Sequence, residues 1–164
     1  MEEIAKIFLT GKESLRSINY FIHMLYPRLK DKKILEKIFL DIGKATKNLA
    51  EALLLYEQAY KRINVKGFSL DGFKKIAKRY LNISEIEFIE HCISKAELIQ
   101  NSSVNFLKQN SYVAMKENGN FIAFSIDDAK QEFSKLQELY AKIEERLRKD
   151  LIMARYLEKI KSKA

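Results

Sequence analysis

An arginine and a histidine stand seven positions apart near the start of the chain, at the two ends of the stretch RSINYFIH. Seven residues make nearly two turns of an α-helix, so the side chains of Arg16 and His23 would lie on one line along a helix. That geometry would let the two side chains act together on a substrate. The alternative is a helix surface that carries both residues by chance.

The spacing of Arg16 and His23 resembles the motif of the HEPN class of helical-bundle ribonucleases. In that class an arginine and a histidine, separated by four to six residues, meet a second pair across a dimer and help to activate a ribose 2′-hydroxyl. The resemblance therefore implies metal-independent RNA cleavage. The pair lies late in the domain in that class, whereas here it falls on the first expected helix. We favour a non-catalytic surface or interface histidine, because seven arginines and two histidines produce such a spacing readily by chance. Asn19 and Tyr20, between the two, offer hydrogen-bonding groups for a structural histidine as well.

Length, composition and charge predict one folded cytoplasmic domain, residues 1–164. The chain is 47% hydrophobic, which excludes disorder, and its formal net charge of +8 favours an anionic partner. The single cysteine, Cys92, excludes an internal disulfide and a zinc site built on several cysteines, and we expect it to be buried. No stretch of about 18 apolar residues occurs, so we expect no membrane contact. We also expect no metal and no cofactor, because no ligand or nucleotide motif is present.

The spacing of apolar residues predicts an all-α protein, a bundle of about five helices. Two long helices come first, and Pro27 should kink or end the first of them near Leu25. Asp31 is expected to cap the second, in which Gly43 and Ala45 would let a neighbouring helix approach closely. A short helix should begin after Ser69. A fourth helix is expected from Asn82 or Ser84 to about Gln100.

The helical period disappears between residues 101 and 125, where YVAMKENGNFIAFS predicts a small β-hairpin insertion at about 112–125. Asn118-Gly119 suits a type I′ turn. That turn would pair Met115 with Ile122, and Val113 with Phe124, in one apolar face against the bundle.

The last helix should begin at Ile126, and its apolar stripe continues to Leu157. Unbroken to Lys161, this helix would be roughly 50 Å long at about 1.5 Å per residue. Such a length predicts that its final turns either project or pack on another chain. A homodimer or a protein partner, joined through the C-terminal helix, therefore remains open.

The opening segment SLRSINYFIHMLYPRLKDKKILEKIFLDIGKA resembles small helical proteins of archaea with reduced genomes. The resemblance covers roughly the first third of the chain. It implies an archaeal, cytoplasmic origin and assigns no site residue.

Basic residues gather between Tyr60 and Tyr80, where seven bases stand against one acid, Asp71. The seven are Lys61, Arg62, Lys66, Lys74, Lys75, Lys78 and Arg79. Lysine and arginine bind phosphates without reading sequence, so these residues predict contact with RNA or a ribonucleoprotein. Two further basic groups occur, at residues 28–33 and 146–163, and acids dilute the second group.

The sequence as a whole predicts a non-enzymatic helical binding module that contacts RNA, a ribonucleoprotein or a protein partner through its basic surface. Two alternatives stay open. One is a HEPN-like ribonuclease that uses Arg16 and His23, and the other is a homo-oligomeric structural protein joined by the C-terminal helix.

Overall fold

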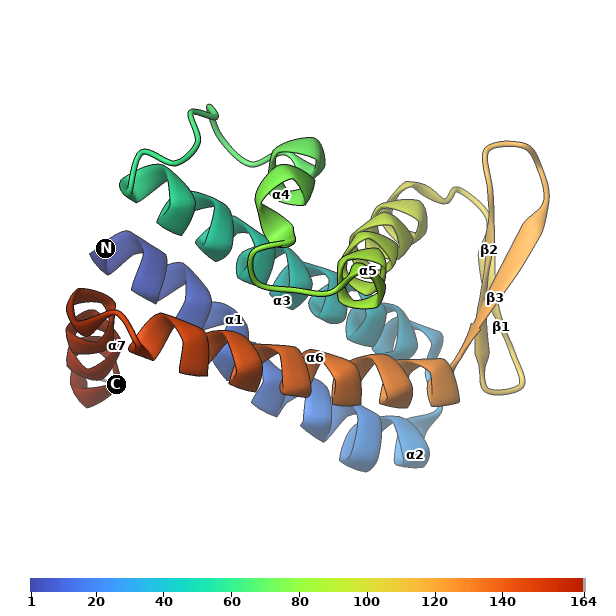
Figure 1. The fold of residues 1–164 in the computed structure, drawn as a ribbon. Coiled ribbons are helices and arrows are strands. Elements are labelled where there is room, and N and C mark those ends of the chain that lie inside the picture. The colour runs from blue at the N-terminus through green and yellow to red at the C-terminus, as the bar shows by residue number, and fades with distance from the viewer. Residues whose placement is uncertain (164) are drawn as a thin grey trace.

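The longest helix, α3 (Lys32–Ala59), runs through the middle of the molecule, and α1, α4, α5 and α6 pack around it (Figure 1). The computed structural model describes residues 1–163, so Ala164, the last residue of the predicted domain, lies outside it. The other elements are α1 (Glu2–Tyr20), a π-helical turn η1 (Phe21–Leu25), α2 (Tyr26–Leu29), α4 (Leu70–Ala77), α5 (Ile83–Asn101), β1 (Asn105–Lys108), β2 (Ser111–Met115), β3 (Phe121–Ser125), α6 (Ile126–Arg148) and α7 (Leu151–Lys163). The predicted fold class, a helical bundle with a small β insertion before the C-terminal region, is confirmed.

The ends of the helices follow local signals in the sequence. The Asp31 carboxylate accepts a hydrogen bond from the backbone N–H of Lys33 at 2.7 Å, and Ser69 caps α4 in the same way. Asn82 and Glu85 form a reciprocal capping box at the start of α5. These side chains satisfy backbone donors that lack a partner inside the helix. The helices α3, α4 and α5 therefore begin directly after a capping residue.

Pro27 does not end the first helical segment near Leu25; the backbone instead widens just before the proline. Proline has no N–H and its ring crowds the carbonyl four residues earlier, and here the backbone N–H of Tyr26 donates to the carbonyl of Phe21, five residues earlier. The chain then continues as α2. This short helix ends at Lys30, whose backbone adopts the left-handed conformation with a φ of 44°.

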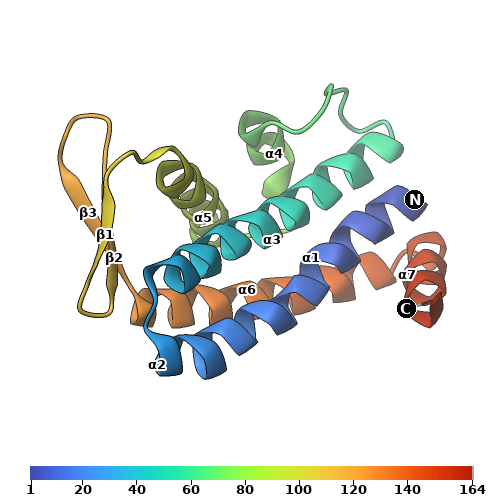
Figure 2. The same ribbon diagram turned by 180° about the vertical axis from the view of Figure 1, so that it is seen from behind.

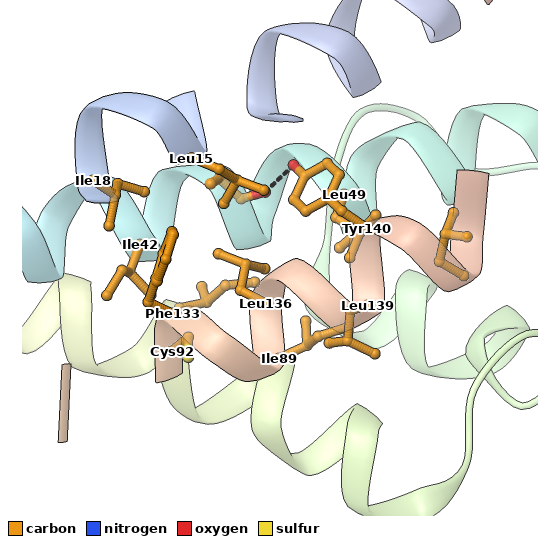
Figure 3. Packing of buried hydrophobic residues seen from close by; sticks show 14 of the residues in the cluster. Leu15, Ile18, Ile42, Leu49, Ile89, Cys92, Phe133, Leu136, Leu139 and Tyr140 are labelled. Atoms are coloured by element: carbon orange, nitrogen blue, oxygen red, sulfur yellow. Dashed lines mark hydrogen bonds between the residues drawn. The ribbon is translucent and has the colours of Figure 1, made fainter. Parts of the chain in front are cut away.

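One continuous apolar core joins the helices and the sheet. Figure 3 shows part of it, where Ile42 and Leu49 of α3 meet Phe133 and Leu136 of α6. The Tyr140 hydroxyl lies within this core and donates to the carbonyl of Ala45 at 2.5 Å. A buried hydroxyl that finds a backbone acceptor avoids the cost of an unpaired polar group.

Two glycines allow the close helix contacts. A methyl group on Gly43 would overlap the methyl of Ala96 on α5, and a methyl group on Gly11 would overlap the Tyr140 hydroxyl. The prediction that Gly43 lets a neighbouring helix approach is therefore confirmed, and the neighbour is α5.

The β insertion is a three-stranded antiparallel sheet in the order β1-β2-β3, rather than the predicted hairpin alone. Strand β1 was not predicted from the sequence, because the turn between β1 and β2 places Gln109 at a φ of 56°. Glutamine rarely adopts a positive φ, and the asparagine of this turn, Asn110, stands at the second position, so Gly or Asn is missing where the turn needs the positive φ.

The predicted pairing of β2 with β3 was wrong by one residue. Five residues separate the two strands, but the N–H of Lys116 donates to the carbonyl of Asn120 and extends the pairing by one step. This leaves a loop of three residues, 117–119, in which Gly119 alone takes a positive φ, 84°. Such a loop is a type I turn followed by a left-handed residue, not the expected type I′ turn. Met115 therefore pairs with Phe121 instead of Ile122, and Val113 pairs with Ala123 instead of Phe124. A one-residue slip exchanges the two faces of the strand.

The prediction of one long C-terminal helix is also wrong, because the helix breaks at Lys149-Asp150. The Asp150 carboxylate accepts hydrogen bonds from the backbone N–H groups of Ile152 and Met153 and thus starts a new helix, α7. In Figures 1 and 2, α7 folds across one end of the bundle, opposite the sheet, and it packs on α1. Met153 and Leu157 are buried there, so the final turns do not project.

No helix among residues 1–163 is both long enough and apolar enough to cross a membrane.

Replacing Gly43 by alanine should destabilise the protein by about 1–3 kcal/mol, because the added methyl overlaps Ala96 and forces α3 and α5 apart. Intrinsic helix propensity acts in the opposite direction, since alanine in a helix is favoured over glycine by about 1 kcal/mol. Urea denaturation monitored by circular dichroism measures the result.

Lys44→Ala is the matched control, because Lys44 is exposed at the next position of α3 and should change stability little. A Gly43→Ala protein as stable as the wild type, or more stable, would contradict the tight contact.

Candidate functional site

The predicted basic residues of 61–79 lie on the connection from α3 to α4, on α4 itself and in the turn that follows. The short helix α4 buries Phe73, Ile76 and Ala77 against the bundle, as its apolar spacing predicts. Its lysines lie on the opposite side, where Lys75 and Lys78 are exposed and Lys74 is half-buried. We call the set of seven bases, Lys61, Arg62, Lys66, Lys74, Lys75, Lys78 and Arg79, the basic surface.

A buried carboxylate lies beneath this surface. Glu57, in the last turn of α3, is 0% exposed. One of its oxygens accepts hydrogen bonds from the Arg62 guanidinium, at 2.9 Å, and from the Tyr80 hydroxyl. The other oxygen accepts from the Arg79 guanidinium. Arg62 and Arg79 are thus held by a single acid that the sequence analysis missed.

The hydrogen bonds keep Glu57 charged. Burial alone would raise the pKa of Glu57, but the hydrogen bonds from Tyr80 and Arg62, with the charges of Arg62 and Arg79, lower it below its ordinary value. The guanidinium groups have several N–H donors each and lie half in solvent, so donors remain free to bind a second anion.

Three tyrosine rings fill the space beside Glu57. The ring centroids of Tyr56 and Tyr60 are 5.2 Å apart, and those of Tyr56 and Tyr80 are 6.5 Å apart. The hydroxyls of Tyr56 and Tyr60 both donate to Asp150, the residue that starts α7. The Arg62 guanidinium lies 4.9 Å from the centre of the Tyr60 ring. This aromatic cluster therefore fixes Arg62 from a second side.

The seven bases divide into two kinds. Arg62 and Arg79 bind Glu57, and Lys74 pairs with Glu90 of α5 at 2.7 Å. The other four are exposed and have no acidic partner within residues 1–163: Lys61, Lys66, Lys75 and Lys78. The surface therefore keeps an excess of positive charge that is not neutralised from within the protein.

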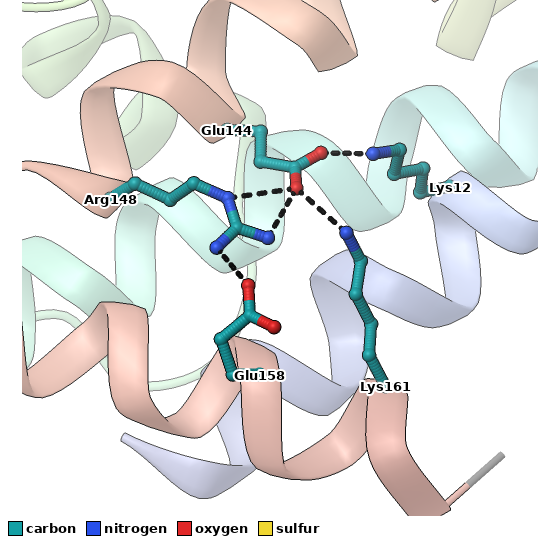
Figure 4. A network of polar contacts seen from close by, with 5 residues as sticks. All are labelled: Lys12, Glu144, Arg148, Glu158 and Lys161. Carbon is teal, nitrogen blue, oxygen red and sulfur yellow. Dashed lines mark hydrogen bonds and ion pairs between the residues drawn. The ribbon is translucent and has the colours of Figure 1, made fainter.

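The basic group at the C-terminal end is arranged differently. Figure 4 shows Glu144 of α6 with three cations around it, Lys12, Arg148 and Lys161, and Arg148 also binds Glu158. These ion pairs join α1, α6 and α7, and the two acids neutralise part of the positive charge in that region. The expectation that acids dilute this group holds for Arg148, Lys159 and Lys161, whereas its other four bases make no ion pair among residues 1–163: Arg146, Lys149, Arg155 and Lys163.

Arg16 and His23 are both exposed, and no hydrogen bond or ion pair connects them in the described part of the chain. His23 lies in the π-helical turn η1, whereas Arg16 lies in regular α-helix. A π-helical turn has more residues per turn than an α-helix, so the heptad spacing of Arg16 and His23 no longer corresponds to two regular α-helical turns. Neither side chain makes a hydrogen bond or an ion pair with any other group of residues 1–163.

A second buried ion pair joins α5 to α6. The Lys95 ammonium donates to Glu132 at 2.7 Å and lies 5.0 Å and 4.6 Å from the ring centres of Phe39 and Phe124. Cys92 is buried beside this pair, as expected, and burial together with the charge of Glu132 raises the pKa of its thiol. A raised thiol pKa leaves Cys92 protonated and unreactive. No cluster of three or more metal-binding side chains occurs among residues 1–163.

No family model, no curated protein and no solved structure matches this chain.

Replacing Glu57 by glutamine should lower the free energy of unfolding by about 1–3 kcal/mol, because it leaves two guanidinium groups without their buried anion. This loss of stability is smaller than for a fully buried ion pair, since the side chains of Arg62 and Arg79 are 45% and 53% exposed. In the variant, solvent can hydrate the two guanidinium groups. Urea denaturation measures the loss, with Glu51→Gln on the same helix as the control. Equal stability of the two variants would show that Glu57 does not anchor the arginines.

The Glu144 network should make stability depend on acid pH. Burial alone would raise the pKa of Glu144, but the hydrogen bonds from Lys12, Arg148 and Lys161 lower it from 4.5 to about 2. A depressed folded-state pKa stabilises the protein above the unfolded value, and this contribution is lost as pH falls from about 5 towards 2.

The Glu144→Gln variant should therefore be less stable than the wild type by roughly 2 kcal/mol at pH 7, and the difference should shrink below pH 5. Chemical denaturation at a series of pH values measures it. Glu145→Gln, at an exposed neighbouring acid, should show no such dependence. A difference that stays constant down to pH 2.5 would contradict the assignment.

Proposed function

We propose that this protein is a non-enzymatic binding module for single-stranded RNA, which it contacts through the phosphate groups along the basic surface. The observation that carries the proposal is the division of that surface into two fixed arginines and four lysines without an acidic partner within residues 1–163. A net charge of +8 supports it, because it attracts polyanions over a long range.

The two kinds of base would contribute differently to binding. Lys61, Lys66, Lys75 and Lys78 would act as point charges that replace counterions on the RNA backbone. Arg62 and Arg79 lose little side-chain freedom on binding, because Glu57 already holds them, and a guanidinium can bind phosphate through two N–H groups. Neither contact reads a base, so the proposal is binding without sequence preference through this surface.

Replacing the four lysines Lys61, Lys66, Lys75 and Lys78 by glutamine should weaken binding to every RNA sequence alike. Each lost phosphate contact lowers the slope of log affinity against log salt by about 0.7 on a single strand, so the slope should fall by about 3. Fluorescence anisotropy with a labelled uridine oligomer, repeated over a salt series, measures both quantities.

A matched control changes the net charge equally but elsewhere, by replacing four other exposed lysines, Lys6, Lys44, Lys149 and Lys163, with glutamine. The control should keep most of the affinity and of the salt slope. Equal losses in both variants would mean that only the total charge matters, and no binding by the wild type at low salt would refute the proposal.

RNA that is incubated with the protein and a chelator should be recovered intact, because the proposed binding does not use Arg16 and His23 for catalysis. Gel electrophoresis measures this. Cleavage that disappears in Arg16→Ala or His23→Ala, with the fold unchanged by circular dichroism, would replace the proposal with a metal-independent ribonuclease.

A further inference from the structure

The three-stranded sheet carries large apolar side chains on both of its faces, although only one of them covers the bundle. Tyr112, Ala114 and Phe124 face inward and are no more than 5% exposed. The corrected register places Phe106 and Phe121 on the other face, since paired residues point to the same side of a sheet. Phe106 and Phe121 are 42% and 54% exposed.

The two exposed rings form one aromatic platform across the strands. Phe106 pairs with Val113 in β2, and Phe121 pairs with Met115 two residues further along the same strand. The centres of the two rings are 5.8 Å apart, with an angle of 61° between the ring planes. Val113, between them, is only 7% exposed, so the rings stand on a packed base that limits their movement.

The charge around this aromatic platform also suits an anionic partner. The three strands contain no aspartate or glutamate, and Lys108 lies on the same face as Phe106. Lys116 follows β2 directly, and the exposed Glu117 comes next in the loop, so the positive charge at the platform comes mainly from Lys108. A group that stacks on the rings and carries a phosphate would therefore meet positive charge at the edge.

The area of the platform is too small for a stable protein interface. Three strands span about 10 Å between the outer two, and four to five residues extend about 17 Å. A face of roughly 200 Å² is well below the about 800 Å² that each partner of a stable protein complex buries. It is large enough for one or two nucleobases, which stack on exposed aromatic rings.

We propose that Phe106 and Phe121 form a stacking platform for unpaired bases of the single-stranded RNA whose phosphates contact the basic surface. This inference rests on the proposed function and adds a second contact to it. The platform lies beside the N-terminal half of α3, as the contact between Phe39 and Phe124 shows, whereas the basic surface follows its C-terminal end (Figure 2). The RNA must therefore span about 40 Å, the length of a 28-residue helix, to reach both.

The test compares two strands of equal charge, a twenty-nucleotide uridine oligomer and an abasic strand with the same number of phosphates. The wild type should bind the uridine strand at least tenfold more tightly, because only that strand has bases to stack. Phe106→Leu combined with Phe121→Leu keeps apolar bulk on the sheet but removes both flat rings. This double variant should bind the two strands equally, with the salt slope of the wild type.

Tyr20→Leu is the control, because Tyr20 is an aromatic residue of similar exposure, 53%, on α1. It should keep the preference for the uridine strand. Circular dichroism and the melting temperature of the leucine double variant establish that it folds. A second double variant, Phe106→Tyr with Phe121→Tyr, should retain the preference for the uridine strand, because tyrosine rings stack on bases as well.

Three results would overturn the inference. If the wild type binds both strands equally, the bases are not stacked, and phosphate binding by the basic surface still stands. If it binds neither strand, the proposed function fails as well. If light scattering shows a wild-type dimer that the leucine variant converts to a monomer, the platform is a contact between two copies of this chain.

Discussion

The close contact of α5 with α3 at Gly43 is the constraint on which the rest of the structure depends. The missing side chain lets Ala96 approach the backbone of α3, so that α5 lies directly on the central helix. That position brings Lys95 within reach of Glu132 on α6 and leaves Cys92 buried beside them. A larger residue at this point would separate the helices and weaken the packed core on both sides of α3.

Buried glutamates fix the remaining parts to this centre. Glu57 holds the turns before and after α4 to the end of α3, Glu132 holds α6 to α5, and Glu144 holds α7 and α1 to α6. An acid removed from water is costly unless cations or hydrogen bonds surround it. Each glutamate therefore specifies which helix faces which, in a way that apolar contacts alone do not.

The same ion pairs determine which basic residues keep an uncompensated positive charge. Around Glu144 three cations share two acids, Glu144 and Glu158, whereas four lysines of the basic surface have no acidic partner among residues 1–163. Counting bases along the sequence cannot make this distinction, because it depends on acids from other helices. Lys74, for example, pairs with Glu90 on the next helix, so it contributes less free charge than its neighbour Lys75.

The sequence by itself determined the helices, their caps at Asp31 and Ser69, and the presence of strands before the last helical segment. Those features depend on the period of apolar residues and on hydrogen bonds between close neighbours, which a single sequence contains. Only the tertiary structure decided the register of β2 with β3, the break before α7 and the burial of Glu57. The physical reason is that each of these depends on partners far away in the chain: the hydroxyl of Tyr56 binds Asp150, which starts α7, and Arg79 reaches Glu57 across the whole of α4.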